Sequence, residues 1–450
     1  MLAITTTRPA LSFAWQINAI SRRRQMISSS SQRARPLQMI YSSQRILPLH
    51  RPPDPSSFTN NTNNTTDNES NYIQSQSTRL QNWLHTKKSI LVITGAGMST
   101  ESGIPDYRGS NGSYFKGHKP IIHHDFMSNE SSRKRYWARS LVGYSPFSMA
   151  QPNGGHEALA RMEELGLIGV DLEGVVGEEV LECLGESCYG SMSINNGDDR
   201  KNNAQQQKQP PPRRLAIITQ NVDILHSKGG SKHVLHLHGR GDIVRCMNCG
   251  VTRDRKEYHD HLSESNREWM EAATAASAKS EMESDKKVRD NDGKKNATSL
   301  RPDGDADWYQ ESYDGMSLPP CPHCGTTHDI NNNHQSGEQQ QQQQQQSFYK
   351  TDVVFFGDSV PRHRFDIAYA AVDAADGILC IGTSLAVHSA YRLAKRALDK
   401  GTEVAILNVG ETRIESEGLD SSTGLVTKIE SPIGDTLAEV VKSYTAAAEK

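Results

Sequence analysis

SILVITGAGMST, at Ser89–Thr100, joins a run of strand-forming apolar residues to a glycine-rich turn. An uninterrupted apolar run of this kind is typical of a parallel strand that is buried on both faces. Three further runs also stop at small or polar residues: LAIIT before Gln220–Asp223, ILCI before Gly382–Ser384 and VAIL before Asn408–Gly410. Because ligands bind outside the carboxyl ends of strands in an open parallel sheet, these four turns predict one nucleotide pocket.

A fifth apolar run, DVVFF at Asp352–Phe356, is followed by a turn and a helix-like stretch at 365–374. With it, five strand patterns alternate with helical patterns along the chain. This alternation predicts an α/β fold, built on a doubly wound parallel sheet of the Rossmann type.

The net charge of the 450 residues is only −3, from 50 basic and 53 acidic side chains. This balance gives no reason to expect a nucleic acid or a membrane surface as a partner. No apolar run approaches the roughly 20 residues that a bilayer-spanning helix needs. Polar, charged or Gln-rich tracts interrupt the globular pattern at 60–71, 195–212, 254–318 and 331–347, and we expect about 260 to 290 ordered residues.

Residues 1–53 are rich in Arg, Ser and Thr, and no acid precedes Asp54. Apolar residues are scattered through this segment, whereas a secretory signal needs a continuous apolar stretch. The composition is typical of an organellar transit peptide. Mitochondrial import to the matrix is our first expectation; a disordered basic tail on a cytosolic or nuclear protein and a chloroplast address are the alternatives.

GAGMSTESGIPDYR, at Gly95–Arg108, combines a tight turn with hydrogen-bond donors. Its first two glycines allow the backbone to approach a phosphate, and Ser99 and Thr100 can donate where a helix begins. No acid ends a strand about 20 residues later, as the common dinucleotide fingerprint requires. An ordinary hydride-transfer enzyme is therefore disfavoured.

Together with TQNVDILH at Thr219–His226, this string resembles the sirtuins, which are NAD-dependent protein deacylases. The resemblance continues through LHG at Leu237–Gly239, two CxxC pairs, DVVFFGD, GTS and NVG, and covers 85–440 apart from the polar insertions. Further strings are similar to the mitochondrial class II branch, described as lipoamidase, deacylase and ADP-ribosyltransferase: RYWAR at Arg135–Arg139, QPN at Gln151–Asn153, SAYR at Ser389–Arg392 and ILNVGETR at Ile406–Arg413.

Polar side chains at a strand end often do no more than cap a turn, and this is the alternative role for Gln220, Asn221 and Asp223. The resemblance implies instead that Asn221 and Asp223 face the nicotinamide and ribose of NAD. It places Asp106 near the nicotinamide amide and Arg108 beside a loop that closes over the cofactor. The residues expected to contact NAD are Gly95, Ala96, Gly97, Ser99, Thr100, Asp106, Tyr107, Arg108, Gln220, Asn221, Val222, Asp223, Gly382, Thr383, Ser384, Asn408, Val409 and Gly410.

His236 and His238 would share one face of an extended segment. A histidine is commonly a structural residue, and a pair of histidines can also hold a metal. The resemblance implies catalysis by His238, together with Asn221, and leaves His236 as packing. A neutral imidazole can take a proton from a ribose hydroxyl, a role usually worth about 10²- to 10⁴-fold in rate.

Two CxxC knuckles, Cys246/Cys249 and Cys321/Cys324, offer the four thiolates that structural zinc prefers. Redox dithiols or disulfides are the alternative. Cys183, Cys188 and Cys380 are expected to be ordinary thiols. In sirtuins the segment matching DVVFFGD pairs with an extended substrate peptide, which would place the acyl-lysine protein at Phe355–Gly357. Tyr114 is present where some class II members place a Tyr and an Arg to read acidic acyl groups, but the spacing to a matching Arg is not, so the sequence does not support a succinyl preference.

The resemblance thus implies an NAD-dependent protein-lysine deacylase that releases nicotinamide and O-acyl-ADP-ribose. Protein mono-ADP-ribosyltransfer and a non-catalytic NAD-sensing scaffold remain the alternatives. We expect a transit peptide at 1–53 and a disordered linker at 54–78. A Rossmann-type domain follows at 79–240 and 350–445, with a polar insertion at about 190–213. A zinc-binding small domain is expected at 241–349, with disordered insertions at 254–318 and 331–347.

Overall fold

The computed structural model describes residues 65–109, 112–114, 119–175, 214–284, 300–306, 308, 310, 312–324 and 347–448. All of them belong to one compact unit, Pro55–Lys450. The predicted transit peptide, the insertion at 190–213 and the Gln-rich tract lie outside the described residues. None of the helices in the described ranges has the length and apolar character that crossing a bilayer requires.

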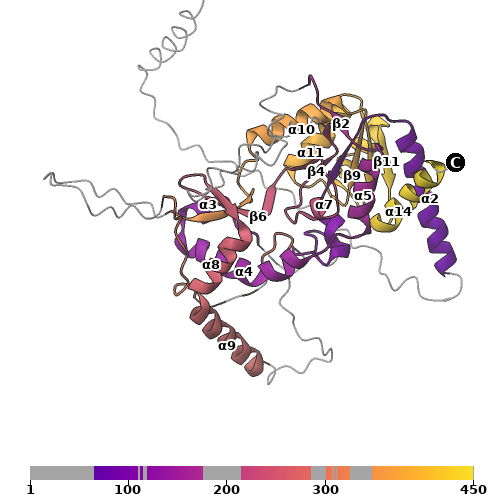
Figure 1. The fold of residues 1–450 in the computed structure, drawn as a ribbon. Helices are drawn as coiled ribbons and strands as arrows, with labels where there is room; N and C mark the ends of the chain where they lie inside the picture. Colours follow the sequence, from indigo (N-terminus) through magenta and orange to yellow (C-terminus); the bar gives the residue numbers. More distant parts are fainter. Residues whose placement is uncertain are drawn as a thin grey trace, which may run out of the picture. The chain divides into compact units, whose positions relative to one another are not determined.

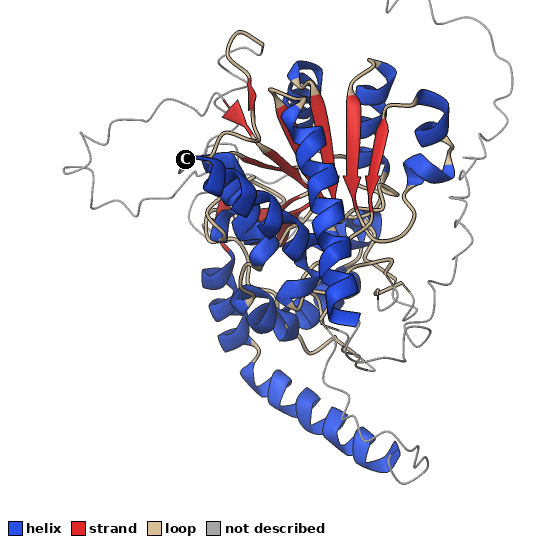
Figure 2. Cartoon of the chain, turned by 90° about the vertical axis from the view of Figure 1, so that its right-hand side faces the viewer, coloured by secondary structure: helices blue, strands red, loops and turns tan. Residues whose placement is uncertain are grey.

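A six-stranded parallel sheet organises the larger part of the described chain (Figures 1 and 2). Its strand order is β11-β10-β9-β1-β4-β5. The strands are β1 (Ile90–Thr94), β4 (Ile217–Thr219), β5 (Val234–His236), β9 (Gly377–Ile381), β10 (Glu403–Leu407) and β11 (Val426–Ile429). Because the chain returns to both sides of β1, the doubly wound α/β prediction is confirmed.

Helices cover both faces of this sheet (Figure 1). One face packs against α10 (Arg362–Ala374) and α11 (His388–Asp399), and the other packs against α2 (Thr65–His85), α5 (Gly154–Glu164) and α14 (Ile433–Ala448). Leu91 and Ile93 of β1 belong to the first apolar cluster, whereas Ile90 and Val92 belong to the second. Side chains that alternate between two buried faces explain why the whole strand is apolar.

Three short helices and a two-stranded antiparallel pair complete this part of the fold. The helices are α7 (Leu225–Lys228), α12 (Arg413–Ser416) and α13 (Leu419–Thr423), and the pair is β2 (Val170–Asp171) with β3 (Arg214–Leu215). A 3-10 helix, η2 (Ala96–Ser102), follows β1 directly. It carries the glycine-rich turn away from the sheet edge.

A separate antiparallel sheet has the order β7-β6-β8, with β7 (Thr252–Asp254), β6 (Gly239–Cys246) and β8 (Tyr349–Val353). We predicted that DVVFF was a strand of the parallel sheet, and this was wrong. Its first residues end β8, which pairs with β6, and Phe356 forms an isolated bridge with Ile122. An apolar run predicts a strand, but its partner depends on where the distant β6 lies.

The third apolar cluster joins this antiparallel sheet to α3 (His123–Ser128), α4 (Glu130–Met149) and α8 (Arg255–Ser265). Trp137 of α4 is fully buried and its ring lies 4.7 Å from that of Tyr258 in α8. We assigned α3 and α4 to the Rossmann-type domain, but they pack with the segment that carries the two CxxC pairs. The predicted boundary at 241 therefore does not follow the packing.

Two segments predicted to be disordered contain helices among the residues that the structure describes. In the predicted insertion 254–318, α8 buries Tyr258 and Leu262, and α9 (Arg267–Ser284) follows it. In the predicted linker 54–78, α2 begins at Thr65 and buries Ser77. Helices α2 and α8 are polar on average because their outer faces are solvated, and a few apolar residues at helical spacing hold them to the core.

Candidate functional site

The glycine-rich turn after β1 packs directly against the turn after β9. The Gly97 amide donates to the Gly382 carbonyl at 2.9 Å, and the Gly95 amide donates to the Ile381 carbonyl at 3.1 Å. A Cβ atom on Gly97 would lie 2.9 Å from the Gly382 oxygen, and one on Gly95 would lie 2.7 Å from Cβ of Thr383. Both positions therefore require glycine, because backbone atoms of the neighbouring turn occupy the space of a side chain.

The polar residues after β4 reach back to this glycine turn. Asn221 is buried, and its Nδ2 donates to the Gly95 carbonyl and to Ser99 Oγ, both at 3.0 Å. Ser99 Oγ in turn donates to Asp223 Oδ2 at 2.6 Å. Burial raises the pKa of Asp223, and the hydrogen bond from Ser99 lowers it in part. Asn221, Ser99 and Asp223 thus form one connected group.

Gln220 joins the ends of three strands. Its Nε2 donates to the Thr94 carbonyl at 3.1 Å and to Thr383 Oγ1 at 2.9 Å. Ala96 and Thr100 lie in η2, where Thr100 Oγ1 donates to the Gly97 carbonyl at 2.9 Å. The predicted contacts from three separate turns therefore lie together at one sheet edge.

The loop after η2 carries Asp106, Tyr107 and Arg108. The Gly109 amide donates to Asp106 Oδ1 at 2.8 Å, which closes a short turn. The Arg108 guanidinium lies 5.1 Å from the ring centre of Tyr114. The ring centres of Tyr107 and Tyr114 are 5.5 Å apart. Aromatic and cation–π contacts thus hold this loop.

His238 lies between the end of the parallel sheet and the start of β6. Its Nδ1 is 3.1 Å from the Gln220 carbonyl oxygen, and its Nε2 is 2.7 Å from Ser389 Oγ. Burial lowers the pKa of His238 to about 4, an effect that the Gln220 carbonyl opposes. The imidazole is therefore neutral at pH 7, the state in which it can accept a proton. His236 is buried at the end of β5, as expected of a packing residue.

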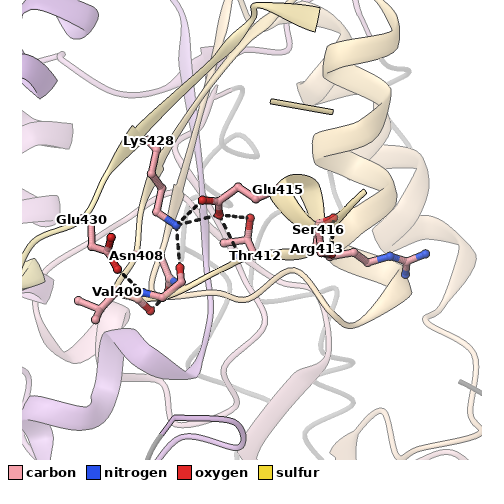
Figure 3. A network of polar contacts seen from close by, with 9 residues as sticks. Asn408, Val409, Thr412, Arg413, Glu415, Ser416, Lys428 and Glu430 are labelled. Atoms are coloured by element: carbon pink, nitrogen blue, oxygen red, sulfur yellow. Dashed lines mark hydrogen bonds and ion pairs between the residues drawn. The ribbon is translucent and has the colours of Figure 1, made fainter. Parts of the chain in front are cut away.

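The loop after β10 holds Asn408, Val409 and Gly410 at the far side of the same edge (Figure 3). Lys428 on β11 donates to the Gly410 carbonyl at 2.7 Å, and Glu430 accepts from the Gly410 amide at 2.7 Å. The side chain of Val409 is 68% exposed. The backbone of this loop is thus fixed by the edge strand while an apolar side chain projects into solvent.

Cys246, Cys249, Cys321 and Cys324 form a compact cluster whose sulfur atoms all lie within 4.8 Å of one another. Cys246 Sγ is 3.6 Å from Cys324 Sγ, and Cys249 Sγ is 3.8 Å from Cys321 Sγ. A disulfide requires about 2.05 Å, whereas a tetrahedral zinc with Zn–S bonds of about 2.3 Å separates its sulfurs by about 3.8 Å. The cluster therefore fits a zinc ion and not two disulfides.

The sequence model of the Sir2 family matches residues 95–170 and 202–389. These ranges contain the glycine turn, the Gln220–Asp223 turn, His238 and the four clustered cysteines. The chain belongs to the Sir2 family. The predicted membership of the sirtuins is confirmed.

Curated relatives support the same Sir2 membership. The NAD-dependent protein deacylase Sirt4 of Drosophila melanogaster is 34% identical over 75% of this chain and 80% of its own length. An NAD-dependent protein deacetylase of Bordetella bronchiseptica is 34% identical over 80% of this chain and 96% of its own length. A solved structure titled "Structural Basis for the Mechanism and Regulation of Sir2 Enzymes" is 21% identical, covers 83% of this chain and 99% of that chain, and has a TM-score of 0.49.

Some residues of this Sir2 site escaped the sequence reasoning. Thr94 and Thr219 end adjacent parallel strands in register, and their hydroxyls lie 2.9 Å apart. Thr94 Oγ1 is also 2.9 Å from Nε2 of His226, whose ring lies 4.9 Å from that of His156. The repeated threonine at two strand ends was a visible signal. The contact of Ser389 with His238 had none, since it joins segments 151 positions apart.

Proposed function

We propose that this Sir2-family protein is an NAD-dependent protein-lysine deacylase that releases nicotinamide and O-acyl-ADP-ribose. The observation that carries the proposal is the link between His238 and the strand-end turns. His238 contacts the Gln220 carbonyl, and the adjacent Asn221 bonds the Gly95 carbonyl and Ser99. A neutral base and a glycine-rich phosphate turn therefore belong to one hydrogen-bonded group. The NAD-dependent names of relatives 34% identical support the same activity.

We assign the phosphates and the adjoining riboses of NAD to the turns at Gly95–Gly97 and Gly382–Ser384. Small residues there leave the backbone accessible, and donors such as Ser99 and Thr100 are close by. Asn221 and Asp223 would take the nicotinamide side, with Asp106–Arg108 on the covering loop. The Asn408–Gly410 loop would take the adenosine side, because β10 lies on the far side of β9 from the base.

In the proposed reaction, the acyl oxygen of the modified lysine attacks the ribose carbon as nicotinamide leaves. His238 Nε2 then removes a proton from a ribose hydroxyl, and water completes the release of lysine. The low pKa of His238, about 4, keeps the imidazole neutral at neutral pH, and the Gln220 carbonyl at Nδ1 leaves Nε2 as the nitrogen without a hydrogen. The substrate backbone would pair beside Phe355–Gly357, where the Phe356 side chain is 39% exposed.

We propose that the four cysteines hold one structural zinc. The strand β6 leads from His238 to Cys246, a path of roughly 25 Å at about 3.3 Å per residue. A closed set of four thiolates also leaves no open position on the metal. Zinc would therefore stabilise the antiparallel sheet and take no part in the reaction.

Incubation of the purified protein with NAD and a panel of acyl-lysine peptides tests the deacylase proposal. The panel contains acetyl, long-chain, lipoyl and dicarboxylic acyl groups, and nicotinamide and peptide mass are followed together. Loss of the acyl mass supports deacylation, and loss of a lipoyl group would place the protein with the lipoamidases. Mass gain on a protein with nicotinamide release would support ADP-ribosyltransfer instead. Absence of both reactions would support an NAD-sensing scaffold and contradict the proposal.

We further propose that the protein acts in the mitochondrial matrix. The Arg-rich and acid-poor composition of residues 1–53 supports this location. A fluorescent protein fused behind residues 1–53 should enter mitochondria. Substitution of the arginines by glutamate in a matched fusion should prevent import, and a diffuse or plastid signal from the unmodified fusion would contradict the proposal.

A further inference from the structure

The hydroxyl of Ser389 contacts the proposed base. Its Oγ lies 2.7 Å from Nε2 of His238, and within the described part of the chain it makes this one hydrogen bond. Ser389 is the second residue of α11, but it does not cap the helix, since Val387 occupies the N-cap position. The hydroxyl is therefore not needed to begin α11.

The two ring nitrogens of His238 have different partners, and this difference locates the proton. Nδ1 faces the Gln220 carbonyl oxygen, which can only accept, so Nδ1 carries the hydrogen. Nε2 of the neutral ring then has a lone pair, to which the Ser389 hydroxyl donates. After the ring gains a proton, Nε2 becomes a donor and the same Oγ can accept. Ser389 can thus bond Nε2 in both protonation states.

A strained turn brings Ser389 to this position. Leu385 is fully buried and has a φ of 53°, in the left-handed region, and Gly382 has a φ of 57°. A non-glycine residue in this region costs about 1 to 2 kcal/mol and persists where its surroundings fix it. The turn directs the chain from β9 into the start of α11, beside His238. The placement of Ser389 is therefore set by a buried backbone.

We propose that Ser389 is a positioning residue for His238, which holds Nε2 toward the cofactor crevice and accepts a hydrogen bond from the protonated ring. This role rests on the deacylase reaction proposed above. In that reaction the Ser389 hydroxyl turns its hydrogen away from Nε2, the proton passes from the ribose hydroxyl to the freed lone pair, the ring becomes positively charged, and Nε2–H donates to Ser389 Oγ. No bond to Ser389 is made or broken beyond this hydrogen bond.

The surroundings of the ring explain why such a partner is useful. Burial disfavours the charged imidazole, and the positive charge of Arg364 disfavours it further, so both lower the pKa of His238. A hydroxyl acceptor at Nε2 offsets part of this cost without adding a second charge to the site. Hydrogen bonds to charged groups contribute more than those between neutral groups.

Two rates measured on the full chain separate this role from a general effect on the pocket. One is deacylation of an acetyl-lysine peptide, which needs the base. The other is exchange of isotopically labelled nicotinamide into NAD, which reports the step before His238 acts. For Ser389→Ala we expect about a tenfold lower kcat for deacylation, with exchange and the KM for NAD within about twofold of the unmodified protein.

Two matched variants accompany the measurement. Ser389→Thr keeps the hydroxyl and should retain at least about half of the deacylation rate. His388→Ala removes the exposed neighbouring side chain from the same turn of α11 and should leave both rates unchanged. If Ser389→Ala does not fold, Ser389→Cys, whose sulfur is a weak acceptor, should show the same selective loss.

Unchanged deacylation by a folded Ser389→Ala overturns the proposal. Loss of exchange together with deacylation also overturns it, because Ser389 would then shape the cofactor pocket rather than act through His238. An unmodified protein that shows neither deacylation nor exchange refutes the proposed deacylase function itself. That result is distinguishable from an active protein that is insensitive to position 389.

Discussion

Gly97→Ala should damage the proposed cofactor crevice, because the added methyl group meets only backbone atoms of the neighbouring turn. The new Cβ would lie 2.9 Å from the Gly382 oxygen and 3.0 Å from its Cα. Neither atom can yield cheaply, because the Gly382 amide is bonded to the Leu407 carbonyl at 3.0 Å. Overpacking of this kind costs about 1 to 3 kcal/mol, and strain on the Gly97–Gly382 hydrogen bond adds about 1 kcal/mol.

We therefore expect the free energy of unfolding of Gly97→Ala to fall by about 2 to 4 kcal/mol, which lowers Tm by roughly 4 to 16 °C in a domain of this size. The KM for NAD should rise at least about tenfold, because the turn that we assign to the phosphates is displaced. Gly154→Ala is the matched control, since nothing lies within 4 Å of a Cβ there, at the first position of α5. A Gly97→Ala protein with unchanged Tm and unchanged KM for NAD would refute this account of the turn.

Four further predictions concern the base, the metal, the adenosine loop and acid stability. His238→Tyr should abolish deacylation while NAD binding, measured by calorimetry, persists; an active variant would exclude His238 as the base. Cys246→Ser should lose zinc and unfold the antiparallel sheet, since such sites contribute roughly 10 kcal/mol or more, and metal analysis that still finds one zinc per chain would contradict the assignment. Lys428→Met should raise the KM for NAD about three- to tenfold with little change in kcat, because it frees the loop of Figure 3 but not the base; a lower kcat at unchanged KM would count against this. Burial lowers the pKa of His156 and His236 to about 4, so the unfolded chain binds more protons below about pH 6.5, and stability should fall from there toward pH 4; urea unfolding with equal midpoints at pH 7 and pH 5 would disprove this.

The parallel sheet was predictable because its strands are buried on both faces. Every residue of Ile90–Thr94 and of Gly377–Ile381 is buried, so each strand appears in the sequence as an uninterrupted apolar run. The strand at Tyr349–Val353 was misplaced for a related reason. An apolar run reports burial but not the partner strand, and its antiparallel pairing with Gly239–Cys246 depends on contacts more than 100 positions apart.

Average composition did not predict the helices that have one buried face and one solvated face. Tyr258 and Leu262 are one helical turn apart and are both buried, yet charged residues surround them in the sequence. A mean over the whole tract 254–318 hides two residues that anchor α8. Spacing is therefore a better guide than composition in segments of this kind.

In the candidate site, too, the residues with a local sequence signal were predicted and a residue placed by distant contacts was not. Strand-end position alone located Gly97, Asn221 and Gly382, because parallel strands bring their carboxyl ends to one edge. Ser389 could not be found by this reasoning, since it lies on a helix and reaches His238 only through the turn at Leu385. A side chain that acts through another residue leaves no pattern of its own in a single sequence.

The turns at the sheet edge are also joined to one another, which sets the expected scale of each perturbation. The Gly97 amide bonds the Gly382 carbonyl, the Gly382 amide bonds the Leu407 carbonyl, and the Asn408 amide bonds the Ile429 carbonyl. Gly97 stands at the inner end of this series, on the central strand β1, so a displacement there reaches the turns after both β1 and β9, to which we assign the phosphates. Lys428 stands at its outer end on the edge strand, where it contacts the proposed adenosine loop and Glu415 of α12 but neither turn after β1 or β9. The difference in predicted KM between Gly97→Ala and Lys428→Met therefore tests whether the four turns act as one site, because independent turns would give no such order.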